Sequence, residues 1–371
     1  MDKNTFTGLF LILLILVGSF FLMKPSEADI KKEKERNHLD SLKKAGIAKP
    51  AAATVKFDTT KQKSAVTDSA ILKTPFGAAT AGTDQLITLE NKDLRIKLSA
   101  LGGRIFSVEL KNYKTFDKKP LILFTGSNNS FGLTFNASGK KINTNNLYFK
   151  PSAANLTVNG KDSSSITMRL SYSPTQYIDY VYTLKGEGFK VGFTIIPTGL
   201  DGVMDNTDKL NINWAANLRK QEKDMKMERQ YTTIYFKNTE NDVDYLSEGK
   251  DDTKEIADKK IQWLSFEAHF FSGVLLSEQG FDKTNIAVKT DVDDTVHVKQ
   301  MEAHLVLNKN SAGAYPLSFY FNPVQHSLLK AEGYHLERQV YMGWPIFAFI
   351  NRYAVLPVFN FLNQFNWNYG L

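Results

Sequence analysis

LRIKLSALGGRIFSVEL, from Leu94 to Leu110, is the stretch of sequence that decides the fold. Apolar and polar side chains alternate in each half of it, which is the period of a β-strand with one buried face. The apolar positions are Leu94, Ile96, Leu98, Phe106, Val108 and Leu110. Between the halves lies Leu101-Gly102-Gly103, and glycine tolerates the positive φ that a tight turn needs. The stretch therefore predicts two antiparallel strands joined by a hairpin turn.

Similar short runs recur from Leu86 as far as Asn322, and turn signals separate them. Further predicted strands are Tyr177–Leu184, Gly188–Ile196, His269–Leu276 and Val296–Leu307, and Leu317, Phe319 and Phe321 share one face of another. Many short strands without helical patterns between them indicate an antiparallel sandwich. The fold class is therefore mainly β, with a β domain over residues 86–322. A region of this length predicts two extended sheets, and it shows no internal repeat.

The N-terminal run from Phe6 to Met23 is apolar and long enough to cross the hydrocarbon core of a bilayer. A cleaved signal peptide is the alternative. The residues after the run, Lys24-Pro25-Ser26-Glu27, offer no A-x-A-like cleavage site, which favours a retained transmembrane anchor over residues 1–23. Basic residues follow the run, but a long following domain weakens the positive-inside rule, so charge leaves the orientation open.

The chain has 371 residues, no Cys and a formal net charge of +7. Without Cys it can form neither disulfides nor thiolate zinc sites, and it has no cysteine nucleophile. Residues 24–85 carry +4 of the net charge, beside the predicted span. Charge at that position suits anionic lipid headgroups. A nucleic-acid partner is not expected, because the β domain shows no basic stripe.

Residues 24–85 read as a flexible charged tether. They are rich in Lys, Glu, Ala, Ser and Thr and poor in aromatic residues, so they cannot bury enough apolar surface to fold alone. Residues 323–342, in contrast, have a helical pattern with a break at Gly333 and predict a helical connector that follows the β domain.

GWPIFAFINRYAVLPVFNFLNQFNWNYGL, from Gly343 to Leu371, is aromatic and almost uncharged. On an α-helix its apolar side chains form one stripe, and a Trp brackets each end. This predicts an amphipathic helix over residues 343–367 that lies in a membrane interface. The predicted interface residues are Trp344, Phe347, Ile350, Ala354, Val358, Phe361, Phe365 and Trp367. Pro357 should kink the helix. The alternative is an ordinary core helix.

The chain offers little sign of catalytic chemistry. It has six His, none of them in an H-x-x-x-H or H-E-x-x-H pattern, and it lacks nucleophile-elbow, P-loop and dinucleotide-binding motifs. Its Asp clusters fall in predicted surface loops. No catalytic residue, metal, cofactor or small-molecule substrate is expected.

Five segments together resemble YidC-type membrane protein insertases. They are MDKNTFTGLFLILLILVG (1–18), ITLENKDLRIKLSALGGRIFSVELKNYKTFDKKPLILF (87–124), YIDYVYTLKGEGF (177–189), IQWLSFEAHFFSGVLL (261–276) and LKAEGYHLERQVYMGWPIFAFINRYAVLPVFNFL (329–362). The resemblance implies a β-supersandwich similar to galactose mutarotases. It also implies a bacterial inner-membrane protein with a cytoplasmic N-terminus and a periplasmic domain. The implied partners are the lipid bilayer, nascent membrane proteins and the Sec translocon.

The implied activity is to insert and fold membrane proteins, alone or with the translocon, and it is not enzymatic. In the family this activity needs a hydrophilic groove with a membrane-embedded Arg. No position of this chain matches that Arg, and residues 368–371 resemble the start of a second transmembrane helix. We therefore expect an N-terminal portion of an insertase. Two alternatives stay open: an anchored periplasmic module that binds clients or the translocon, and a mutarotase-like carbohydrate-active enzyme.

Overall fold

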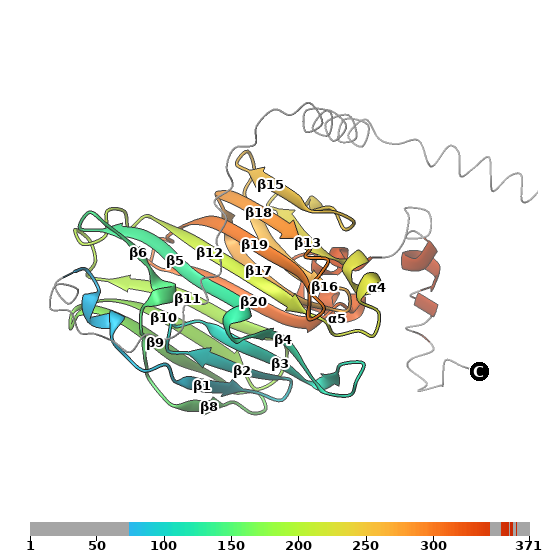
Figure 1. Ribbon diagram of the computed structural model, residues 1–371, viewed down its shortest axis with the longest axis horizontal. Coiled ribbons are helices and arrows are strands. Elements are labelled where there is room, and N and C mark those ends of the chain that lie inside the picture. Colours follow the sequence, from blue (N-terminus) through green and yellow to red (C-terminus); the bar gives the residue numbers. More distant parts are fainter. Residues whose placement is uncertain (1–73, 342–349, 356, 359–360, 362–371) are drawn as a thin grey trace, which may run out of the picture. The chain divides into compact units, whose positions relative to one another are not determined.

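The computed structural model describes residues 74–341, 350–355, 357, 358 and 361 (Figure 1). The chain divides into two compact units, of which residues 60–340 form one and residues 1–59 with 341–371 form the other. The β domain lies in the first unit. Of the helices that the described residues form, none combines the length and the hydropathy needed to cross a membrane. The predicted anchor at residues 1–23 lies outside the described residues.

Three sheets make up the β domain. The five-stranded sheet has the order β4-β3-β2-β1-β8. Its strands are β1 (Leu86–Glu90), β2 (Leu94–Ser99), β3 (Ile105–Lys114), β4 (Pro120–Thr125) and β8 (Asn155–Thr157). The predicted hairpin joins β2 to β3, with φ of +84° at Gly102 and +61° at Gly103. The strand prediction for the opening stretch is thus confirmed.

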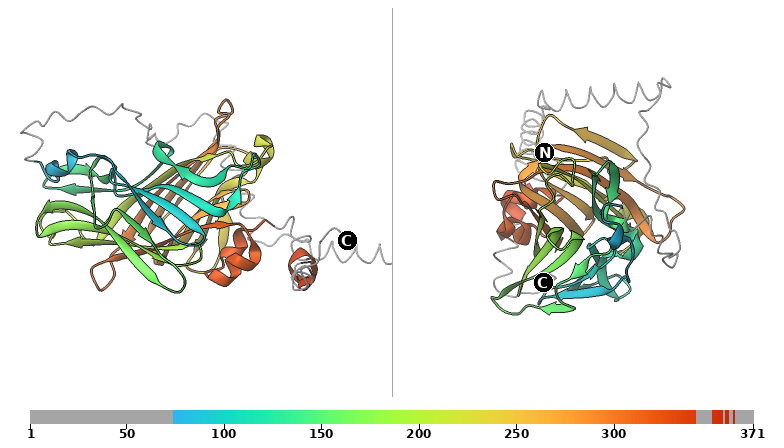
Figure 2. Two further views of the ribbon diagram at one scale, coloured as in Figure 1. Left: turned by 90° about the horizontal axis from the view of Figure 1, so that it is seen from below. Right: turned by 90° about the vertical axis from the view of Figure 1, so that its left-hand side faces the viewer.

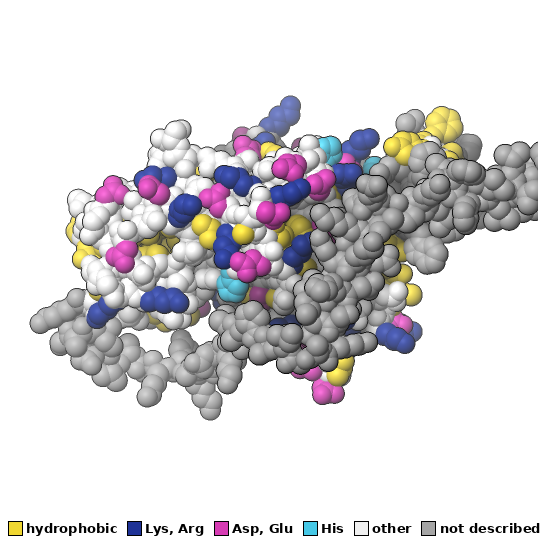
Figure 3. Space-filling view, turned by 90° about the horizontal axis from the view of Figure 1, so that it is seen from above, with side chains coloured by type: hydrophobic (Ala, Val, Ile, Leu, Met, Phe, Trp, Pro, Cys, Tyr) yellow, Lys and Arg dark blue, Asp and Glu magenta, His cyan; other side chains and the backbone are white. Residues whose placement is uncertain are grey.

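The six-stranded sheet has the order β15-β18-β19-β12-β5-β6. Its strands are β5 (Asn129–Ala137), β6 (Lys140–Asn143), β12 (Lys209–Arg219), β15 (Asp252–Ile256), β18 (Lys283–Lys289) and β19 (His297–Asn308). Basic and acidic side chains are interspersed on the face of the molecule that Figure 3 shows. This mixture of charges is that of an ordinary solvated surface.

The nine-stranded sheet has the order β14-β13-β16-β17-β20-β11-β10-β9-β7. Its strands are β7 (Lys150–Pro151), β9 (Ser163–Ser173), β10 (Gln176–Lys185), β11 (Lys190–Thr198), β13 (Thr232–Asn238), β14 (Val243–Tyr245), β16 (Ile261–Ala268), β17 (Phe271–Phe281) and β20 (Tyr315–Pro323). The sequence predicts two sheets, and this is wrong, because the β domain has three. The 3-10 turn η2 (Gly126–Asn128) separates β4 from β5, so consecutive strands belong to different sheets.

The main core lies between one face of the nine-stranded sheet and the two smaller sheets. Aromatic side chains fill it: the Trp214 ring stacks on Phe266 with 3.8 Å between centroids, and Phe131 meets Phe193 edge-on at 5.4 Å. Such contacts add to the stabilisation that apolar burial supplies. The two views of Figure 2 show the sheets as stacked layers with helix α5 outside them. The prediction of a mainly β sandwich is confirmed.

The short helical elements connect or cover the strands. They are η1 (Gly77–Thr80), η2, η3 (Thr144–Asn146), α4 (Met225–Gln230), α5 (His326–Glu332), η4 (Leu336–Gln339) and the π-helical turn η5 (Asn351–Val355). Part of the predicted tether is also packed. Phe76 is buried and meets the rings of Phe135 and Tyr172 edge-on. The stretch from Thr74 therefore belongs to the sandwich, because one aromatic anchor holds a segment that composition assigns to the tether.

Candidate functional site

The connector covers part of the outer face of the nine-stranded sheet, over β13, β16, β17 and β20. A second apolar cluster forms there, separate from the main core. Its buried members are Tyr235, Trp263, Val274, Leu276 and Tyr320 from the sheet, Leu329 from α5 and Leu336 from η4. The central strands of this sheet are therefore buried on both faces. We call this contact the connector seat, and it fixes residues 326–340 on the β domain.

Hydrogen bonds orient the connector in its seat. The indole Nε1 of Trp263 donates to the carbonyl oxygen of Tyr334 at 2.9 Å, and the Ser265 hydroxyl donates to Oε1 of Gln339 at 2.8 Å. Both partners of the second bond are fully buried. A buried polar pair of this kind stabilises only one arrangement of the two segments, because a displaced connector would leave both groups unpaired. The connector seat therefore fixes the end of the connector relative to the sheet.

A buried polar row crosses the same outer face. Thr233, Glu267, Ser272 and Asn322 are neighbours across β13, β16, β17 and β20, and each is at most 2% exposed. Oε2 of Glu267 and Oδ1 of Asn322 have no hydrogen-bond partner in the described part of the chain. Burial, and then the nearby Glu248, raise the pKa of Glu267 well above its usual range. Burial therefore favours the protonated, neutral form of this carboxyl, which costs less to bury than a carboxylate.

A second buried carboxyl belongs to Glu228 on α4. It accepts hydrogen bonds from the backbone N–H groups of Gln221 and Glu222. Burial raises its pKa to about 7, and these hydrogen bonds only partly offset that effect. The folded protein therefore keeps a proton that the unfolded chain, with a pKa near 4.5, has lost at neutral pH. Stability falls as the pH rises from about 4.5 to about 7 and is then constant with respect to this group.

The substitution Glu228→Gln should flatten that pH dependence. In the parent chain, Glu228 should make the free energy of unfolding fall by about 2–3 kcal/mol between pH 5 and pH 7, since one pKa unit corresponds to about 1.4 kcal/mol. Urea unfolding at pH 5, 6 and 7 should show that Glu228→Gln lacks this fall. Glu187→Gln is the matched control, because Glu187 is exposed and forms only a 3.8 Å surface pair with Lys92. Equal slopes for the parent chain and Glu228→Gln would show that Glu228 ionises normally in the folded state.

The predicted interface residues are only partly covered by the structure. Trp344, Phe347, Phe365 and Trp367 lie outside the described residues. Ile350, Ala354, Val358 and Phe361 are described and are exposed. Their role at a membrane interface stays a prediction.

The described part of this segment is not one regular α-helix. Asn351–Val355 form the π-helical turn η5, two residues before Pro357. Proline has no N–H to donate, and its ring crowds the carbonyl one turn earlier, so the hydrogen-bond ladder changes register there. The apolar stripe from Phe347 to Phe365 stays a prediction.

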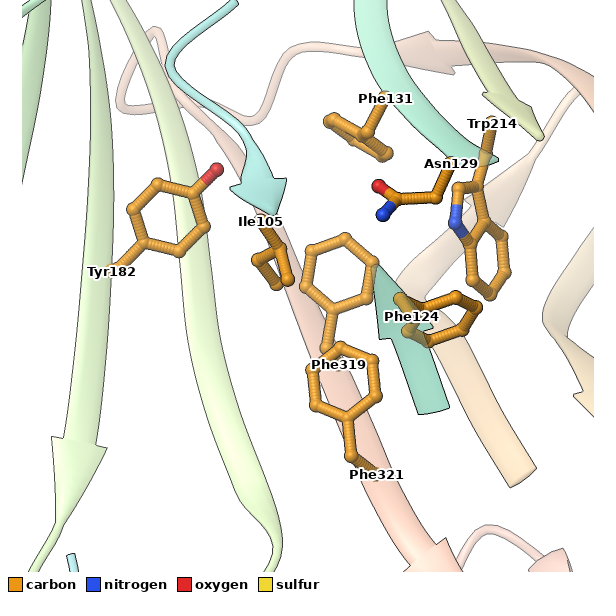
Figure 4. A pocket seen from close by; sticks show the side chains of 8 residues that line it. All are labelled: Ile105, Phe124, Asn129, Phe131, Tyr182, Trp214, Phe319 and Phe321. Atoms are coloured by element: carbon orange, nitrogen blue, oxygen red, sulfur yellow. The ribbon is translucent and has the colours of Figure 1, made fainter. Parts of the chain in front are cut away.

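A small cavity inside the main core is the place to look for a mutarotase-like substrate site. It is lined by Ile105, Phe124, Asn129, Phe131, Tyr182, Trp214, Phe319 and Phe321 (Figure 4). It has room for about one water molecule. Neither a carboxylate nor a His is among the lining residues, so acid–base chemistry on a sugar has no groups to use there.

Asn129 and Tyr182, which line this cavity, already have hydrogen-bond partners in the protein. Asn129 accepts from Nη1 of Arg104 and donates to the carbonyl oxygen of Phe106, both at 2.9 Å. The Tyr182 hydroxyl donates to the carbonyl oxygen of Gly103 at 2.8 Å, and burial raises the pKa of Tyr182. These side chains serve the packing of the sandwich rather than a ligand.

Two of the described His residues, His297 and His269, contact neighbouring side chains of the β domain. Nδ1 of His297 lies 2.7 Å from Asp294, and Nε2 lies 2.9 Å from the amide of Asn128. His269 is stacked between the rings of Tyr231 and Phe270. It lies in the β16–β17 turn with φ of +52°, so the strand predicted from His269 begins only at Phe271. Among the described residues, no group of three His, Cys, Asp or Glu could hold a metal ion.

Sequence reasoning did not find the connector seat. The signal was present in IQWLSFEA, because every residue of β16 except Gln262 is buried. A run without polar alternation indicates a strand that is covered on both faces. Ser265 and Glu267 interrupt that pattern in the sequence, since both are polar, and only the structure shows that both are buried and that Ser265 bonds to the connector.

Two smaller sheets packed on a nine-stranded sheet, with an aromatic interior and a helical cover, define a large β-sandwich. The family model described as the YidC periplasmic domain matches residues 86–355. The chain therefore belongs to the YidC periplasmic domain family.

Curated relatives match the whole chain. It is 34% identical to the membrane protein insertase YidC of Parabacteroides distasonis and 35% identical to that of Bacteroides fragilis. Each match covers 100% of this chain and 60% of the relative. The chain thus spans about three fifths of the length of these relatives.

Solved structures similar to this chain include sugar-epimerase-like proteins. One is a putative aldose 1-epimerase from Escherichia coli K12, with a TM-score of 0.38 and 10% identity, covering 65% of this chain and 100% of that one. Another is a galactose mutarotase-like protein from Lactobacillus casei, with a TM-score of 0.38 and 12% identity, covering 64% of this chain and 100% of that one.

Proposed function

We propose that this chain supplies the membrane anchor, the periplasmic sandwich and the connector of a membrane protein insertase. The protein inserts and folds inner-membrane proteins, alone or with the Sec translocon. The observation that carries the proposal is the family match over residues 86–355, joined to full-length similarity with relatives named as insertases. The proposed topology has a cytoplasmic N-terminus, a span over residues 1–23 and a periplasmic β domain.

The connector seat supports this assignment. The segment after Val340 is the aromatic stretch proposed to lie in the membrane interface. Residues 326–340 are held on the nine-stranded sheet by Trp263, Ser265 and a buried apolar cluster, so the last residues before that stretch are fixed on the β domain. In this proposal, the domain positions the interfacial segment for insertion rather than transforming a substrate.

Depletion of the gene product that contains this chain tests the function. In its native cells, depletion should lower the membrane insertion of a single-span inner-membrane protein several-fold, measured as protease-accessible periplasmic domain after pulse labelling. Re-expression of the parent gene should restore insertion, and export of a soluble periplasmic protein serves as the control for general damage. Unchanged insertion after complete depletion would contradict the proposed function.

A further inference from the structure

Three loop regions meet at one end of the sandwich, around α4 (Figure 1). The backbone N–H of Phe116, in the β3–β4 turn, donates to the carbonyl oxygen of Gln221 at 3.0 Å. Gln221 precedes α4, and Tyr231 directly after α4 stacks on His269 of the β16–β17 turn. We call this surface the α4 end. It comprises residues 114–119, 220–230 and 268–270.

Large apolar side chains are exposed at the α4 end. Phe116 is 50% exposed, Met227 54% and Phe270 50%. Each comes from a different segment, and these segments are fixed to one another by the contacts above. The Phe116 ring also lies 5.4 Å from Nζ of Lys220. Three large exposed apolar groups on loops that are tied together make this end a candidate interaction surface.

Lysines surround these apolar groups. Lys114, Lys118, Lys223 and Lys226 are exposed, and none has a carboxylate partner in the described part of the chain. Two carboxylates in these segments already have partners. Asp117 pairs with Lys119 at 2.6 Å, and Asp224 caps α4 by accepting from the N–H of Met227. Residues 114–119 and 220–230 therefore present a positive surface with apolar tips.

An acidic loop borders this surface. Residues 290–296 contain Asp291, Asp293 and Asp294, and carbonyl oxygens of this loop accept hydrogen bonds from Arg229 on α4. Asp294 also pairs with His297. The loop also accepts a hydrogen bond from the backbone N–H of Lys220 at Val296, so its carboxylates border the positive surface, and the four lysines outside the loop are the groups left to face an anionic partner.

We propose that the α4 end is a bilayer-docking surface, with Phe116, Met227 and Phe270 entering the headgroup layer and the four lysines facing anionic lipid phosphates. Aromatic and apolar tips among Lys side chains are the combination that binds anionic interfaces. The inference rests on the proposed function, which tethers this chain to a membrane. Because a tether raises the effective concentration of the bilayer, a weak contact suffices to hold the domain in one orientation.

Site-specific fluorescence tests the docking surface in the full chain, which contains no Cys of its own. Single cysteines at Phe116, Met227 and Tyr172 carry an environment-sensitive dye, and the chain is placed in lipid nanodiscs that contain phosphatidylglycerol and nitroxide-labelled lipid. Tyr172 is exposed and belongs to the β9–β10 end, opposite to the α4 end. Quenching at positions 116 and 227 should exceed quenching at position 172 several-fold.

Two further comparisons separate a docked domain from a merely tethered one. In phosphatidylcholine discs, or in 1 M salt, which screens charges beyond about 3 Å, the excess quenching should fall. The charge-reversal triple K118E/K223E/K226E should lose it too, whereas K140E/K141E on β6 should keep it. Equal quenching at the three positions in discs that hold the chain overturns the docking surface alone. A chain that does not co-purify with the discs overturns the proposed anchor as well.

Discussion

Replacing Trp263 with alanine is expected to lower the free energy of unfolding by about 3–5 kcal/mol, the usual cost of deleting a large buried aromatic side chain. Trp263 is fully buried in the connector seat, and its indole donates the hydrogen bond that holds Tyr334. The substitution removes apolar contacts and leaves the carbonyl oxygen of Tyr334 without its partner. Urea unfolding followed by circular dichroism measures the loss.

The same substitution should free the connector before the sandwich unfolds. Limited proteolysis of Trp263→Ala in native buffer is expected to cut within residues 324–341 faster than in the parent chain. Val292→Ala is the matched control, because Val292 is 76% exposed, and it should change stability by less than about 0.5 kcal/mol. A loss of less than about 1 kcal/mol for Trp263→Ala, with unchanged proteolysis, would rule out the connector seat as a stabilising contact.

The alternation of polar and apolar residues was sufficient to predict seven of the twenty strands that the described residues form. The predicted Tyr177–Leu184 and Val296–Leu307 correspond to β10 (Gln176–Lys185) and β19 (His297–Asn308). In β20, Leu317, Phe319 and Phe321 face the main core and Tyr320 faces the connector, as their alternation predicts. These predictions hold because a strand with one apolar face has only one way to bury it.

The alternation of polar and apolar residues does not predict local irregularities of the strands. A β-bulge shifts the register of β2 and β3 at Leu98, so Ile105 rather than Phe106 turns toward the core. A bulge adds one residue to one strand and reverses the facing of those that follow it.

The connector seat shows a different limit. Gln339 is fully buried and bonded to Ser265, yet the two residues are 74 positions apart in the chain. No local pattern links a polar residue at the end of a connector to a polar residue in a central strand. The interfacial segment is the converse case, since its composition predicts a membrane contact that only an experiment with lipid can test.

The location of the β domain is the central claim, and cysteine accessibility tests it most directly. A single cysteine at Tyr172 reports on the β domain, and one at Asn4 reports on the N-terminus. In cells with a permeabilised outer membrane, a membrane-impermeant maleimide should label the Tyr172→Cys protein almost completely. It should label the Asn4→Cys protein only after the inner membrane is opened. Labelling of Asn4→Cys in intact cells, with Tyr172→Cys protected until lysis, would contradict the anchored periplasmic domain and with it the proposed function.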